Sequence, residues 1–140
     1  MAGKDDPLSG VWYSGVGSKL ELRVDGSKLV GFFHSTESPG GKYELVGSVD
    51  PDPNLPNRAL SFSVSWITSD TPNEFRSVTS YTGQYHRYDR DGDEAINTIF
   101  LLADETGPKK QYASTYIGYD NFGKTEPSAE QVEKERRRRR

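Results

Sequence analysis

The sequence is poor in several residue types, and each shortage excludes a class of structure. It has no cysteine, which excludes disulfide bonds and thiolate metal sites. No apolar run approaches the ~20 residues of a membrane-spanning helix. Only 32% of the 140 residues are apolar, whereas glycine and proline number 14 and 8. This composition is typical of one domain built from short strands and turns.

Histidine and positive charge are also scarce in most of the chain. His34 and His86 have no second His or Cys nearby in the sequence, so we expect no metal site. The acidic run 89–94 lacks the glycine and the distal acid of a calcium loop and is expected to be a turn. Five arginines end the chain, and without them 13 basic residues stand against 21 acidic ones. We therefore expect no nucleic-acid and no membrane partner.

What the sequence does have is alternation of apolar and polar residues between Ser9 and Phe122. Leu20, Leu22 and Val24, for example, alternate with charged residues, as in a half-buried strand. Asp-Gly pairs and prolines separate such segments. The pattern predicts an all-β protein with eight strands in sequential hairpins. Such strands can close into an antiparallel up-and-down β-barrel, which leaves no sheet edge exposed.

The two ends of the chain differ from this central part. We expect a flexible N-terminus over residues 1–7, a barrel domain over 8–125 and a disordered or frayed basic tail over 126–140. The tail has helix-forming residues but is short for an isolated helix. Residues 1–7 are polar and unlike a secretory signal, so the chain as it stands is expected in the cytoplasm. Secretion would follow if a signal had been removed.

Six stretches resemble, in the same order, segments of the avidin/streptavidin family. Together they cover about residues 8–125, and their shared order makes the resemblance specific. The chain is most similar to the fungal avidins called tamavidins in Ser18–Leu22 and Lys124–Gln131. The six stretches are Ser9–Ser18, Leu29–Ser35, Phe62–Trp66, Tyr81–Tyr85, Ile96–Leu102 and Ser114–Phe122.

The resemblance implies a non-enzymatic protein that binds biotin at one end of an avidin-like barrel. It implies no cofactor other than biotin as the bound ligand. It also implies a homotetramer, with a dimer as the alternative, and a role in sequestering the ligand from competitors.

The resemblance also assigns polar contacts to the ureido ring of biotin. Ser14, Ser18 and Phe33 stand where the family surrounds the ureido oxygen with asparagine, serine and tyrosine donors. Only Ser18 matches, since Ser14 is shorter than asparagine and Phe33 has no hydroxyl group. Ser35 and Asp120 match the acceptors for the two ureido N–H groups. Binding weaker than that of the tightest family members is therefore expected.

The remaining assignments concern the rest of the ligand. Thr79 matches the hydroxyl that contacts the biotin sulfur, and Ser77 and Ser38 correspond to contacts of the carboxylate tail. Tyr112 stands where family tetramers place a tryptophan that reaches into a neighbour's site. The apolar wall is assigned to Trp66, Tyr81, Phe100, Leu102 and Tyr112.

Other functions stay open at this point. The altered residues Phe33 and Ser14 favour an avidin-fold protein whose pocket binds a different small molecule. A lipocalin-type carrier is disfavoured by the absence of cysteine and by the polar set assigned to the pocket. Ser, His and Asp are all present, but no local signature supports a catalytic triad, so no enzymatic activity is expected.

Overall fold

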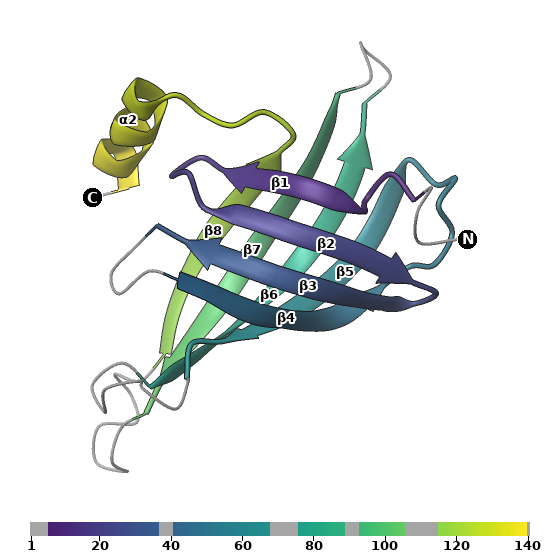
Figure 1. The fold of residues 1–140 in the computed structure, drawn as a ribbon, viewed down its shortest axis with the longest axis horizontal. Helices are drawn as coiled ribbons and strands as arrows, with labels where there is room; N and C mark the ends of the chain where they lie inside the picture. The colour runs from purple at the N-terminus through teal and green to yellow at the C-terminus, as the bar shows by residue number, and fades with distance from the viewer. Residues whose placement is uncertain (1–5, 37–40, 68–75, 89–92, 106–114, 140) are drawn as a thin grey trace.

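The protein is an eight-stranded antiparallel barrel, as the sequence predicts (Figure 1). The computed structural model describes residues 6–36, 41–67, 76–88, 93–105 and 115–139. Each strand pairs with the next along the chain, and the last pairs with the first. The strands are β1 (Gly10–Ser14), β2 (Lys19–Asp25), β3 (Lys28–Ser35), β4 (Gly41–Val49), β5 (Asn57–Ser65), β6 (Ser77–Arg87), β7 (Glu94–Asp104) and β8 (Thr115–Gly123).

Alternation along the strands fills the barrel with apolar side chains. On β2, Leu20, Leu22 and Val24 are buried, whereas Arg23 is exposed. β5 follows the same rule, because successive side chains of a strand point to opposite faces. The buried apolar cluster is Leu8, Trp12, Leu20, Leu22, Val24, Leu29, Phe33, Leu45, Val49, Leu60, Phe62, Val64, Tyr81, Tyr85, Ile96 and Phe122.

A buried ion pair lies near the N-terminal end of β5. The Arg58 guanidinium donates to the two Asp6 carboxylate oxygens at 2.7 and 2.9 Å. It also donates to the Asp50 carbonyl oxygen at 2.8 Å from Nη2. Asp6 was expected in a flexible N-terminal segment, but it is only 5% exposed. The sequence could not reveal this contact, since the partners are 52 residues apart.

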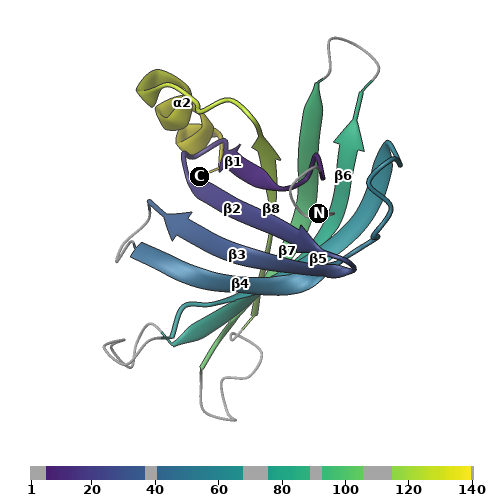
Figure 2. The same ribbon diagram turned by 45° about the vertical axis from the view of Figure 1, so that its right-hand side comes forward.

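Beyond β8 the chain forms a helix, α2 (Ala129–Arg139), where a disordered or frayed tail was expected (Figures 1 and 2). Ser128 and Gln131 cap its N-terminus reciprocally: the Gln131 backbone N–H donates to Ser128 Oγ at 3.1 Å, and the Ser128 backbone N–H donates to Gln131 Oε1 at 2.8 Å. Ion pairs one turn apart add to its stability. Among the described residues, no helix is long and apolar enough to span a membrane.

The ion pair generates the first prediction. Replacing Asp6 with Asn removes the charge that faces a fully buried guanidinium, and breaking a buried pair in this way is strongly destabilising. We expect Asp6→Asn to lower the free energy of unfolding by about 3 kcal/mol. Urea denaturation measures this change, and Asp25→Asn, at an exposed position on β2, is the matched control. Equal midpoints for the two variants would contradict the prediction.

Candidate functional site

The topology gathers the candidate residues toward one end of the barrel. In an up-and-down barrel, the C-terminal ends of odd-numbered strands meet the N-terminal ends of even-numbered strands. Ser14 and Ser35 end β1 and β3, and Ser77 and Thr79 open β6. Trp66 directly follows β5. Residues from distant parts of the chain are therefore brought to the same end.

The turn between β1 and β2 supplies two buried hydroxyl groups, those of Ser14 and Ser18. The backbone N–H of Ser18 donates to Ser14 Oγ at 3.0 Å, which fixes the Ser14 side chain. A hydroxyl group that accepts in this way keeps its own hydrogen for donation. The Thr36 hydroxyl donates to the Val16 carbonyl oxygen at 3.3 Å, so the end of β3 is tied to the same turn.

Phe33 lies at the centre of an aromatic cluster inside the barrel and is 4% exposed. Its ring centroid is 5.2 Å from that of Trp66, in an edge-to-face arrangement. It is 5.9 Å from the stacked Tyr81 ring and 6.5 Å from Phe122. Ser14 stands opposite Phe122 in the β1–β8 ladder, which places the polar turn next to these rings.

Tyr81 extends the aromatic cluster toward β7. It stacks on Phe62 at 4.6 Å between ring centroids and lies 5.5 Å from Phe100. The Phe100 ring covers Gly118, where an added Cβ would lie 2.4 Å from Phe100 Cζ. Burial, and then the nearby Asp120 carboxylate, raise the pKa of the Tyr81 phenol well above its ordinary value. The phenol therefore stays neutral at physiological pH.

Trp66 and Thr79 join the rings to the polar part of the site. The indole N–H of Trp66 donates to the Thr79 hydroxyl oxygen at 2.7 Å, and Thr79 is only 1% exposed. Leu102 stands opposite Thr79 in the β6–β7 ladder and is half-buried. Tyr43 contacts Trp66 edge-to-face at 5.0 Å. This hydrogen bond and these contacts hold the indole ring in place at the end of the cluster.

Asp120 is the one acidic side chain among the candidates. It is 7% exposed on β8, and its carbonyl oxygen accepts a 2.7 Å hydrogen bond from the Thr98 hydroxyl. Its Oδ1 accepts two contacts of 3.3 Å from the Arg139 guanidinium of α2. An anionic acceptor is thus held at the barrel wall beside a cation from outside the barrel.

Two further serines lie at strand ends, and two candidates cannot be placed. Ser35 is half-buried opposite Gly41, and the Ser77 carbonyl oxygen accepts from the Trp66 backbone N–H at 3.0 Å. Ser38 and Tyr112 lie outside the described residues. Part of the site was missed from the sequence. The aromatic cluster also contains Tyr43, Phe62 and Phe122, and the polar part contains Arg139.

The signals for the missed residues differ in strength. Phe62 and Tyr43 stand at inward positions of alternating segments, so the pattern already indicated their burial. For Arg139, the only signal was the helix-capping pair Ser128 and Gln131. In the described part of the chain, no group of three or more His, Asp or Glu side chains is arranged to hold a metal ion.

The comparison with known protein families agrees with the fold. The model of the Avidin family matches residues 2–125, which spans all eight strands and stops before α2. The members of this family are binding proteins for biotin and are not enzymes. The match covers well over half of the chain, so this protein belongs to the avidin family.

Proposed function

We propose that this chain binds biotin, without enzymatic activity, at the end of the barrel that holds the polar turn and the aromatic cluster. The observation that carries the proposal is the juxtaposition of Phe33 and its ring neighbours with buried hydroxyl groups and a buried carboxylate. Biotin has an apolar bicycle fused to a polar ureido group. Such a ligand leaves water without a large penalty only where both kinds of partner are available.

The polar atoms of the ureido ring find complementary groups in this proposal. Ser14 and Ser18 donate to the ureido oxygen from the β1–β2 turn. Asp120 and Ser35 accept from the two ureido N–H groups. A hydrogen bond to an ionised carboxylate is roughly twice as strong as a neutral one, so Asp120 is the main acceptor.

In this proposal the remaining candidate residues contact the apolar part and the tail of the ligand. The bicycle packs against the side chains of Trp66, Tyr81, Phe100 and Leu102, and Thr79 contacts the sulfur. Ser77 and Ser38 contact the carboxylate of the tail at the end of the barrel. In an oligomer, Tyr112 reaches the site of a neighbouring copy.

The phenylalanine at position 33, where the family has tyrosine, determines the strength of biotin binding that we expect. Phe33 keeps an aromatic ring at its position but has no hydroxyl group, so the ureido oxygen lacks one donor. We propose binding weaker than that of the tightest avidins and a similarity closest to the fungal tamavidins. Sequestration of biotin from competitors is the proposed role. The same substitution favours the alternative, a pocket that prefers a different small molecule.

An exposed apolar face supports the proposal of a homotetramer, with a dimer as the alternative. It lies on the outer side of β6, β7 and β8, where alternate residues are large and apolar. Ile117 is 76% exposed and Ile99 62%. A contiguous face of this kind is typical of a surface that a partner covers. Its members are Val78, Ile99, Leu101, Ile117 and Tyr119.

The direct test of the proposed function is thermal unfolding with and without biotin. A ligand at 1,000 times its dissociation constant stabilises the folded state by about 4 kcal/mol. We expect millimolar biotin to raise the melting temperature clearly, and calorimetry to give one site per chain. Desthiobiotin, which lacks the sulfur, should produce a smaller shift. No shift and no heat with biotin would leave the alternative of a different ligand.

A second prediction concerns the missing hydroxyl group. An unmet hydrogen bond in a buried site costs ~1–3 kcal/mol, which is roughly 5- to 150-fold in affinity. We expect Phe33→Tyr to slow biotin dissociation by a factor in this range. Phe32→Tyr adds the same group to the other face of β3 and should leave the rate unchanged. Equal rates for both variants would mean that the ureido ring does not face Phe33.

The proposed assembly is tested by light scattering at micromolar concentration. We expect four times the chain mass of 15.7 kDa. Ile117→Glu should reduce the mass, because it places a charge in the apolar face. Val46→Glu, at a 60% exposed position on β4, is the control and should leave the mass unchanged. A parent mass near that of one chain would overturn the proposed assembly.

A further inference from the structure

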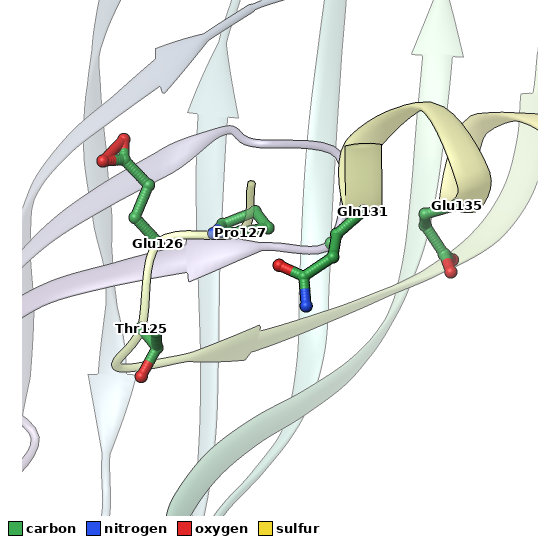
Figure 3. A pocket seen from close by; sticks show the side chains of 6 residues that line it. Thr125, Glu126, Pro127, Gln131 and Glu135 are labelled. Carbon is green, nitrogen blue, oxygen red and sulfur yellow. The ribbon is translucent and has the colours of Figure 1, made fainter. Parts of the chain in front are cut away.

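Helix α2 packs closely against the turn that carries the two site serines. At Gly15 an added Cβ would lie 3.2 Å from Glu135 Cγ, and at Gly17 it would lie 3.4 Å from Val132 Cγ2. Gly17 also has a φ of +89°, which disfavours any side chain there. Between turn and helix lies an open pocket of about 320 Å³, outside the barrel (Figure 3). It is lined by Gly15, Thr125, Glu126, Pro127, Gln131 and Glu135.

Helix α2 lies beside the β1–β8 ladder, which is the shortest ladder of the barrel. β1 pairs with β8 at only two positions, Tyr13 with Gly123 and Ser14 with Phe122. β8, in contrast, pairs with β7 along the whole length of β8. The part of β8 that precedes Phe122 thus extends past the end of β1, and Arg139 lies beside it. Its Nη1 is 3.4 Å from the Tyr119 carbonyl oxygen, and its guanidinium lies 4.8 Å from the Tyr119 ring centroid.

Arg139 connects this outer contact to the interior of the barrel. Both of its Nη atoms approach the same atom, Asp120 Oδ1, at 3.3 Å. Its Nε donates to Glu135 Oε2 at 2.8 Å, one turn earlier in α2. Hydrogen bonds from Arg138 and Arg139 hold the pKa of Glu135 below its ordinary value, so Glu135 stays ionised at neutral pH. The Arg139 side chain is 24% exposed and that of Asp120 11%.

We propose that Arg139 is a positioning residue for biotin, acting through Asp120. The inference rests on the proposed function. The terminal torsion of an aspartate is soft, so each donor bound to its carboxylate narrows the range of orientations that the carboxylate samples. Two donors that converge on Oδ1 fix the carboxylate plane and supply a counter-charge at the barrel wall. The acceptor is then oriented before the ligand arrives, which reduces the entropic cost of binding.

The test measures biotin dissociation from variants of the full chain. Arg139→Ala should dissociate about fivefold faster than the parent, which corresponds to about 1 kcal/mol. Arg139→Lys should restore part of the difference, because an ammonium group can still donate to Oδ1. Arg137→Ala is the matched control, since it removes an equal charge from an Arg that pairs with Glu133. The control should dissociate at the parent rate.

The salt dependence of biotin dissociation distinguishes this electrostatic role of Arg139 from a merely structural role of the helix. Raising NaCl from about 0.05 to about 1 M screens a partly exposed ion pair. Dissociation from the parent and from Arg137→Ala should accelerate, whereas dissociation from Arg139→Ala should not respond. Parent-like rates and salt response for Arg139→Ala would overturn this inference while leaving the proposed function intact. Absence of biotin binding by the parent itself would overturn the proposed function and this inference with it.

Discussion

Closure of the sheet is the constraint on which the rest of this structure depends. Eight strands remove both sheet edges only if β8 returns to β1, and that return encloses the side chains that face inward. The interior must then be filled by the side chains themselves, and here aromatic rings do this around Phe33. The short β1–β8 ladder is the weakest part of this closure. Helix α2 packs beside it, so a segment beyond the last strand takes part in completing the wall.

Polar groups inside such a barrel are costly unless each has a partner. The candidate site residues meet this requirement through contacts within the chain. Ser14 accepts from a backbone N–H of its own turn, Thr79 accepts from Trp66, and Asp120 contacts Arg139. These contacts fix the side chains before any ligand is present. Groups that are satisfied in this way can serve a ligand only with their remaining donors and acceptors, and this limits which small molecules fit.

Local pattern predicted the barrel but not the contacts that close it. Alternation in segments such as Leu20–Val24 specifies which face is buried, and this depends on neighbouring residues alone. The burial of Asp6 depends on Arg58, which is far away in the sequence, so no local rule could reveal it. The contact of Arg139 with Asp120 likewise depends on how α2 packs. For the candidate site, the family resemblance suggested the residues, and only the fold showed which rings contact one another.

The order of the strands also has a consequence for how the chain folds. Seven of the eight ladders join strands that are neighbours in the sequence, so each closes a short loop at low entropic cost. The eighth joins Tyr13 to Gly123, across 110 positions, and offers the fewest backbone pairs in return. The few hydrogen bonds of this ladder offset the entropic cost of closing so long a loop only after the hairpins have formed, because the hairpins shorten the chain between the two strands. We therefore expect closure of the barrel to be a late folding event, and the candidate site, which borders that ladder, to be among the last parts of the molecule to form.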